Sequence, residues 1–318
     1  MIFCDPRRLK SRGIMGMNKR NISYIGRYNP RSLYKQVDDK LITKQLALKN
    51  AIDTPDLISV ISEQHEIEEV NDRVKGHDGF CIKPAQGSGG KGILVITKVE
   101  DGRYFKPSGE EVTQVEMARH CSNILAGLFS LGGKNDVAVV EALIRFDPVF
   151  DGISYEGVPD IRLIIFKGYP VMGMLRCSTH ASDGKANLHQ GAVGIGVDIA
   201  TGQAIRAVQY DEPVSHHPDT GEDLFKVQVP HWDRLLELAS GCFEMSGLGY
   251  LGTDMVLDKE RGPLLLELNA RPGLAIQIAN NHGLLPRLRK IESLGDAPVP
   301  VTQRIALAKQ WFGTDGEY

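Results

Sequence analysis

Two carboxylates and an amide in the segment "TDMVLDKERGPLLLELNARPG" have the chemistry and the spacing of a metal site. If the turn of this hairpin centres on Glu260 and Arg261, Asp254 faces Glu267, and Asn269 shares their face of the strand pair. Two facing carboxylates repel each other, so they need a cation or a shared proton. Because Mg²⁺ prefers such oxygen ligands, we predict a Mg²⁺ site. The alternative is a hairpin whose acidic side chains face water.

A glycine-rich stretch, "CIKPAQGSGGKG" at residues 81–92, could hold an anion. Glycine exposes backbone N–H groups and allows close approach, so a loop of this kind between two strands is suited to covering phosphates. Lys83 lies on the strand before the loop, where an inward lysine needs an anionic partner. The P-loop pattern fails because Ala85 replaces its first glycine and Gly92 follows Lys91, and the dinucleotide fingerprint fails because no helix follows the glycines. The alternative is a flexible hairpin tip.

The elements that must position these residues follow from hydrophobic periodicity and from turn residues, and they predict an α+β fold. Helices are expected at residues 38–55, 63–76, 110–133 and 231–247, and strands at 56–62, 79–85, 92–99 and 136–144. Further strand pairs are expected within 159–178, 184–208 and 250–274. We predict a basic amino-terminal segment (1–37), a first lobe (38–140), a second lobe (141–290) and a carboxy-terminal tail (291–318). The register that decides whether Arg162 and Arg176 share a face stays open.

Composition excludes several classes of protein. The formal net charge of −3 argues against a nucleic-acid partner, and five scattered cysteines without a CxxC pair argue against a zinc site or a disulfide framework. No apolar run is long enough to span a bilayer, and the amino terminus lacks a signal peptide's apolar core, so a cytoplasmic location is expected. His216 and His217 lie in a polar loop, where they could contact substrate, but we expect them to face solvent.

The motifs together resemble the ATP-grasp superfamily. The resemblance rests on "DK" ending at Lys40, "IKPAQGSGGKGI", "DIR" at 160–162, "LR" at 175–176, "NLHQGA" at 187–192 and "TDMVLD…LLLELNARPGL" at 253–274. It covers about residues 38–285 and is strongest to the α-L-glutamate ligase-like branch. It implies an ATP-grasp fold, in which two α+β lobes clasp ATP, with ATP and Mg²⁺ as cofactors and Mn²⁺ as an alternative cation.

The resemblance also assigns roles to the matching positions. Nucleotide contacts are implied for Lys40, Lys83, Gly87, Ser88, Gly89, Gly90, Glu141, Ala142, Leu143 and Asp160. Asp254, Glu267 and Asn269 match the magnesium ligands, in agreement with the hairpin argument. Arg176 and Asn187 match catalytic positions, and Arg162, Lys185 and Arg271 are expected to contact substrate.

The implied function is an ATP-dependent carboxylate–amine ligase that forms an amide through an acylphosphate, with small-molecule or peptide substrates. Lys185 stands where glutamate ligases carry arginine, which puts glutamate as the donor in question. The amino-terminal lobe is reduced to residues 1–37, so we expect a homo-oligomer or a partner chain to complete the substrate site. The alternatives are a nucleotide-binding subunit without turnover, and a ligase whose acceptor is a thiol or a sugar amine.

Overall fold

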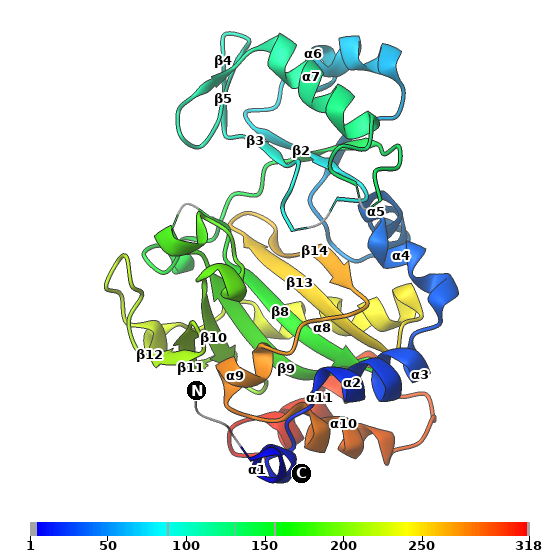
Figure 1. The fold of residues 1–318 in the computed structure, drawn as a ribbon, viewed down its shortest axis with the longest axis vertical. Helices are drawn as coiled ribbons and strands as arrows, with labels where there is room; N and C mark the ends of the chain where they lie inside the picture. The colour runs from blue at the N-terminus through cyan, green and yellow to red at the C-terminus, as the bar shows by residue number, and fades with distance from the viewer. Residues whose placement is uncertain (1–4, 88, 131, 156, 317–318) are drawn as a thin grey trace. The chain divides into compact units, whose positions relative to one another are not determined.

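The computed structural model describes residues 5–87, 89–130, 132–155 and 157–316 (Figure 1). Contacts within the chain divide it into two units: the larger comprises residues 1–37, 46–53 and 146–318, and the smaller comprises 38–45 and 54–145. Ser88, which was expected to contact nucleotide, lies outside the described residues.

The smaller unit holds a four-stranded antiparallel sheet in the order β1-β7-β2-β3 and a three-stranded sheet in the order β4-β5-β6. The strands are β1 (Leu57–Ile61), β2 (Phe80–Pro84), β3 (Leu94–Ile96), β4 (Lys98–Glu100), β5 (Arg103–Phe105), β6 (Glu111–Val112) and β7 (Ala138–Ala142). The helices are α6 (Val70–Arg73) and α7 (Gln114–Leu125). Helix α7 begins at a capping box, in which the side chains of Thr113 and Glu116 each accept a hydrogen bond from the other's backbone N–H group. This cap fixes the start of the helix, and the residues just before it form β6.

The larger unit is built on a seven-stranded antiparallel sheet in the order β12-β11-β10-β9-β8-β13-β14. Its strands are β8 (Asp160–Phe166), β9 (Tyr169–Cys177), β10 (Val193–Val197), β11 (Ala204–Gln209), β12 (Glu212–Val214), β13 (Tyr250–Asp258) and β14 (Gly262–Asn269). Its later helices are α8 (Trp232–Ser246), α9 (Ile276–Asn280), α10 (Leu284–Glu292) and α11 (Val301–Phe312). Among the described residues, none of the helices has the length and apolar character needed to cross a bilayer.

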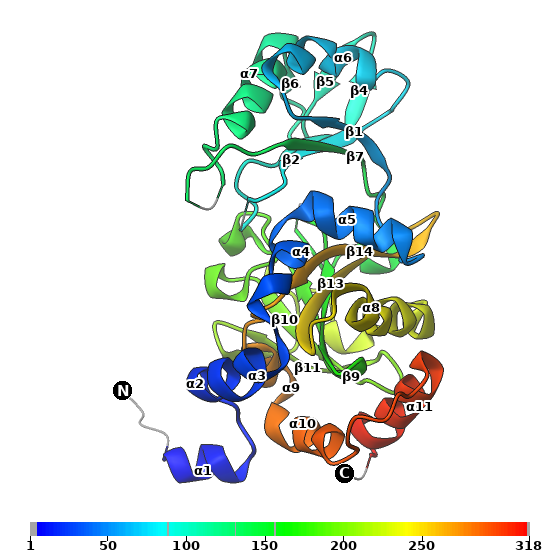
Figure 2. The same cartoon turned by 90° about the vertical axis from the view of Figure 1, so that its right-hand side faces the viewer.

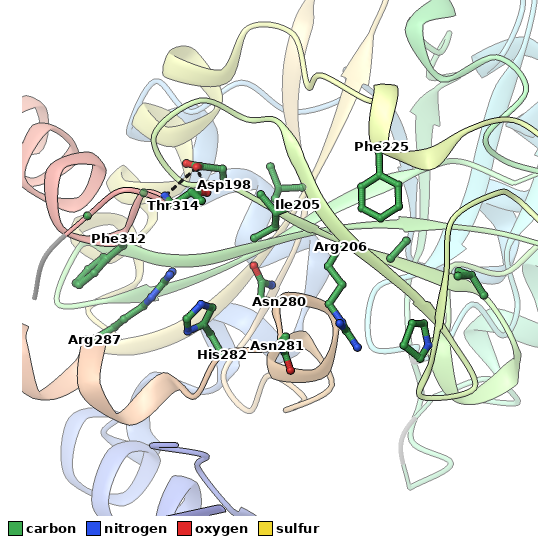
Figure 3. Close-up of a pocket in the computed structure, with 16 residues that line it drawn as sticks. Asp198, Ile205, Arg206, Phe225, Asn280, Asn281, His282, Arg287, Phe312 and Thr314 are labelled. Carbon is green, nitrogen blue, oxygen red and sulfur yellow. Dashed lines mark hydrogen bonds between the residues drawn. The ribbon is translucent and has the colours of Figure 1, made fainter. Parts of the chain in front are cut away.

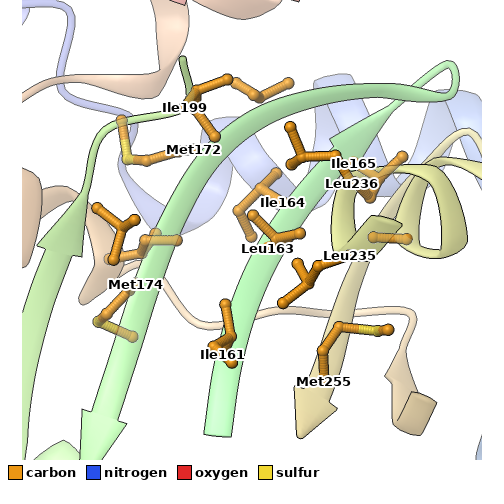
Figure 4. Close-up of a cluster of buried hydrophobic side chains, with 14 of the residues drawn as sticks. Ile161, Leu163, Ile164, Ile165, Met172, Met174, Ile199, Leu235, Leu236 and Met255 are labelled. Carbon is orange, nitrogen blue, oxygen red and sulfur yellow. The ribbon is translucent and has the colours of Figure 1, made fainter. Parts of the chain in front are cut away.

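Helix α8 covers one face of this large sheet. Figure 4 shows Leu235 and Leu236 of α8 beside Leu163 and Ile165 of β8, within a cluster of fully buried side chains. Period-two alternation therefore directs the neighbouring polar positions of β8, β9 and β13 to the opposite face. Charged side chains lie on this opposite face of the sheet, while the buried apolar layer packs against the other face.

The two central hairpins fix which charged residues meet. Strands β13 and β14 close around a tighter loop than expected, with Asp258 opposite Gly262, but a bulge at Leu266 restores the predicted pairing of Asp254 with Glu267. In the hairpin of β8 and β9, Asp160 lies opposite Arg176. Arg162, two residues along, therefore shares a face with Arg176.

Both ends of the chain contain helices that the sequence did not indicate. The amino-terminal segment forms α1 (Pro6–Ser11), α2 (Met17–Lys19), a π-helical turn (Arg20–Ile25), α3 (Gly26–Tyr28) and α4 (Lys35–Asp38), followed by α5 (Lys40–Lys49). The expected carboxy-terminal tail contains α11. Figure 2 shows α1 beside α10, where Leu285 N donates to Gly13 O at 3.1 Å. The predicted separate end segments thus belong to the larger unit.

Candidate active site

Two arginines and two aspartates form a buried network on the face of the large sheet opposite α8. The Arg162 fork donates to both Asp254 oxygens, with Nη2–Oδ2 at 2.6 Å. Arg176 donates to both Asp160 oxygens at 2.5 and 2.7 Å, and its Nη2 also lies 3.0 Å from Asp254 Oδ2. Each guanidinium keeps one nitrogen, Nη1, without a hydrogen-bond partner among the described residues. The network therefore presents two oriented donors.

The charges in this network influence one another strongly. Burial raises the pKa of Asp160, and so does the neighbouring Asp254 carboxylate, although Arg176 acts against them. Burial would also raise the pKa of Asp254, but Arg162 and Arg176 hold it below its ordinary value. Burial opposes the charge of Arg176, yet the two carboxylates raise its pKa. Arg176 therefore stays charged at neutral pH, and Asp254 stays ionised.

The three predicted metal ligands lie together at the edge of this network. Glu267 is the cross-strand partner of Asp254, and Asn269 lies two residues further along the same face. In the described part of the chain no group donates a hydrogen bond or forms an ion pair with the Glu267 carboxylate. No cluster of three or more His, Cys, Asp or Glu side chains placed for a metal occurs in the same ranges, so a cation here would rely on two carboxylates and an amide.

The three side chains are suitable ligands for a hard cation, because each of them supplies an oxygen atom. The repulsion between Asp254 and Glu267, which motivated the metal prediction, is already offset by the guanidinium groups of Arg162 and Arg176. The carboxylate of Glu267 is the one that remains available.

The three other expected catalytic or substrate residues lie outside the network. Lys185 is exposed and pairs with Asp183 at 3.0 Å. Asn187 caps a short 3-10 turn, accepting from His189 N at 3.0 Å. The Arg271 guanidinium lies 5.4 Å from the Tyr34 ring centroid. Their expected roles stay predictions.

In the smaller unit, two lysines share one buried carboxylate. Lys83 Nζ lies 2.5 Å from Glu141 Oε2, and Lys44 Nζ lies 2.9 Å from Glu141 Oε1. All three side chains are at most 7% exposed. Burial alone would raise the pKa of Glu141, but the two ammonium groups lower it. Burial lowers the pKa of Lys44, and Glu141 acts in the opposite direction. The group carries one net positive charge, which is suited to an anionic ligand.

The glycine loop is anchored at its base. Lys40 Nζ donates to Gly87 O at 2.6 Å, and Gly87 is required because a Cβ there would lie 2.4 Å from Pro84. Buried Asp136 accepts from Gln86 N at 3.0 Å and from Ser130 Oγ at 2.5 Å. Gly89 and Gly90 have φ values of 64° and 75°, in the region that favours glycine. The loop therefore has a fixed base and a glycine tip.

Sequence reasoning missed two of these residues. Lys44 is one turn after Lys40 on α5, so the "DKLITK" spacing already placed both on one side of a helix. Asp136 was assigned to a strand without a role. The Glu141 side chain pairs with the lysines, and Ala142 N donates to Asp56 O at 2.9 Å. The expected nucleotide contacts of Glu141 and Ala142 stay predictions.

His217 was expected to face solvent, and that expectation is wrong. Its side chain is buried, with Nε2 3.1 Å from Ser178 O, because the polar loop folds back onto the end of β9. His216 is exposed, as expected.

Comparison with known families decides the classification. The sequence model of the family described as sugar-transfer associated ATP-grasp matches residues 19–293. The chain belongs to this family. The predicted ATP-grasp superfamily and α+β fold are thereby confirmed, whereas a place in the glutamate ligase-like branch is not specifically shown. ATP-grasp proteins use ATP with Mg²⁺, so membership also supports the predicted cofactors and the predicted class of enzyme.

Solved structures with a similar fold are remote in sequence. D-alanyl-alanine synthetase A from Vibrio cholerae is 12% identical, with a TM-score of 0.48, covering 87% of this chain and 66% of its own. The ATP-grasp ligase PsnB complexed with a minimal precursor is 12% identical, with a TM-score of 0.47, covering 83% and 61%. The chain thus spans about two thirds or less of the length of these two proteins. No curated protein sequence matches it.

Proposed function

We propose that this protein is an ATP-dependent carboxylate–amine ligase. The observation that carries the proposal is the network of Arg162, Arg176, Asp160 and Asp254 beside the Glu267 carboxylate, which has no partner among the described residues. A protein that only binds nucleotide has no need for two buried guanidinium groups with free Nη1 donors. Such donors suit a reaction in which negative charge develops on oxygen.

Within this proposal, the smaller unit binds the phosphates of ATP. Lys83 and Lys44 supply the net positive charge around Glu141, and Lys40 holds the glycine loop at Gly87. Asp254, Glu267 and Asn269 of the larger unit would hold Mg²⁺, which supplies charge neutralisation at the transferring phosphoryl group.

The reaction joins a carboxylate to an amine in two steps. A carboxylate oxygen takes the γ-phosphoryl group of ATP, giving an acylphosphate and ADP. The amine then attacks the carbonyl carbon and a C–N bond forms. The bond from this carbon to the bridging oxygen breaks, inorganic phosphate leaves with that oxygen, and the amine gives up a proton. Arg176 Nη1 is the donor that we assign to the oxyanion of this second step, and Arg162 Nη1 to the substrate carboxylate.

The proposal extends to the chemical class of the amine acceptor. The family description associates these proteins with sugar transfer, which favours an amine carried on a sugar over a thiol. Glutamate as the carboxylate donor stays a prediction, because Lys185 cannot provide the bidentate fork of an arginine.

A substrate panel tests the proposal. Amino acids, amino sugars and short peptides are supplied in pairs with ATP and Mg²⁺, and ADP release is measured beside amide formation. We expect equal amounts of ADP and amide with one pair, and little ADP when either partner is left out. Nucleotide binding without ADP release by any pair would favour the subunit without turnover.

Nucleotide affinity should depend on Lys83. Replacing Lys83 with methionine leaves Lys44 and Glu141 as a balanced pair, so the fold is retained while the net positive charge is lost. We expect ATP affinity to fall about tenfold or more, which corresponds to about 1.4 kcal/mol. Calorimetric titration measures it, with exposed Lys98→Met as the matched control. Equal affinity in the wild type and Lys83→Met would remove this lysine from the nucleotide site.

A further inference from the structure

A cavity lies in the larger unit, apart from the charged network. It occupies about 730 Å³ between β11, β12, the end of α9 and the end of α11 (Figure 3). This volume is within the range of small-molecule sites, which is about 300–1,000 Å³. None of the residues given a role in the ligase proposal lines it.

The charges that line the cavity are unbalanced in favour of cations. Arg206 and Arg287 lie along it in Figure 3, and Asp198 is its one acidic lining residue among those described. Burial and the neighbouring Arg287 lower the pKa of His282, so this lining residue does not add a positive charge at neutral pH. The Asp198 carboxylate is already satisfied, because it accepts from Ala200 N at 2.6 Å, from Thr314 N at 2.9 Å and from the Thr314 hydroxyl. The cavity therefore offers positive groups to a ligand and no free carboxylate among the described residues.

Arg206 is the best placed of these groups to bind a ligand. It lies on β11 opposite Gly196, where α9 packs so closely that a Cβ on Gly196 would lie 2.5 Å from Ala279 O. Arg206 is half-buried, its Nε is shielded from solvent, and this atom has no hydrogen-bond partner in the described part of the chain. A buried donor without a hydrogen-bond partner is destabilising, and the guanidinium group that carries it belongs to a residue that lines the cavity.

Arg287 is a fixed wall of the cavity. Its Nη1 donates to Val171 O at 2.8 Å, and its guanidinium lies 5.4 Å from the Phe312 ring centroid. Its side chain is therefore held by the sheet on one side and by α11 on the other. Ile205, Val214 and Phe225 add apolar surface to the lining.

We propose that this cavity binds a small organic anion, a compact molecule with one carboxylate or phosphate group that Arg206 anchors. Arg206 lies on the same sheet face as Arg162, three strands away through Gly196 and Met174. With strands about 4.8 Å apart, the separation is about 14 Å, so the ligand does not occupy the place of the reacting groups. The proposal does not rest on the ligase activity.

Three glucose derivatives that differ in charge test the proposal. Glucuronate, glucose 6-phosphate and neutral glucose are titrated by calorimetry into the full chain, without nucleotide or Mg²⁺. We expect at least one anion to bind at least tenfold more tightly than glucose. Preference between the two anions distinguishes a carboxylate ligand from a phosphate ligand. No binding of either anion at about 10 mM would overturn the proposal.

Variants locate the binding. Arg206→Gln should weaken anion binding at least tenfold, Arg206→Lys should retain part of it, and exposed Arg31→Gln should leave it unchanged. A thermal melt of each variant checks that the fold persists. Anion binding that is equal in the wild type and in a folded Arg206→Gln variant would place the ligand elsewhere and contradict the assignment.

Discussion

Replacing Glu141 with glutamine should lower the free energy of unfolding by about 3–5 kcal/mol, the usual cost of breaking a buried ion pair by removing one partner. The change removes the carboxylate that the buried Lys44 and Lys83 share. Because the pKa of Glu141 is lowered in the folded protein, its contribution is present at neutral pH and is lost as the pH falls below about 4. Urea unfolding at pH 7 and in acid measures the difference from the wild type, which should shrink in acid.

Two further variants separate this stability effect from binding. Exposed Glu100→Gln serves as the matched control and should change the free energy of unfolding by less than about 0.5 kcal/mol. Replacing all three residues with apolar ones, Lys44→Met, Lys83→Met and Glu141→Leu together, should recover most of the stability but not nucleotide affinity. If Glu141→Gln is as stable as the wild type at pH 7, the buried triad does not exist as described.

Turnover should collapse in Glu267→Gln while the fold persists. The glutamine keeps the shape of the side chain, and Arg162 and Arg176 already offset the charge of the facing Asp254, so thermal stability without metal should stay close to that of the wild type. Loss of a cation ligand at the transferring phosphoryl group should lower ADP release by ~10² or more, about 2.7 kcal/mol. The measurement compares ADP release with Mg²⁺ and a competent substrate pair.

Glu260→Gln is the matched control, because Glu260 lies in the turn of the same hairpin and is exposed. Its turnover should equal that of the wild type. A Glu267→Gln variant that melts lower yet turns over normally would make Glu267 a structural residue.

The sequence predicted the pairing of Asp254 with Glu267, although for a reason that was only partly right. The expected turn implied one register along the whole hairpin, whereas the structure has a tighter turn and a bulge at Leu266. The two differences cancel at the charged pair. Bulges depend on how neighbouring strands pack, so a spacing rule cannot locate them.

The sequence indicated on which face of a strand each charged residue lies better than it indicated the ion-pair partners of these residues. Arg162 and Arg176 were recognised, but the carboxylates that hold them follow from a hairpin register that the sequence left open. The pairing of Lys44 and Lys83 with Glu141 joins α5, β2 and β7, three elements distant in sequence. Local periodicity carries no information about such contacts.

Oxygen transfer from the substrate carboxylate to phosphate is the most direct test of the proposed ligase. A competent substrate pair is supplied with ATP and Mg²⁺, with ¹⁸O in the carboxylate of the donor, and the inorganic phosphate is analysed by mass spectrometry. Because the acylphosphate loses its phosphate with the bridging oxygen, we expect one ¹⁸O in each phosphate released and ADP as the nucleotide product. Unlabelled phosphate, or AMP with pyrophosphate, would contradict the account.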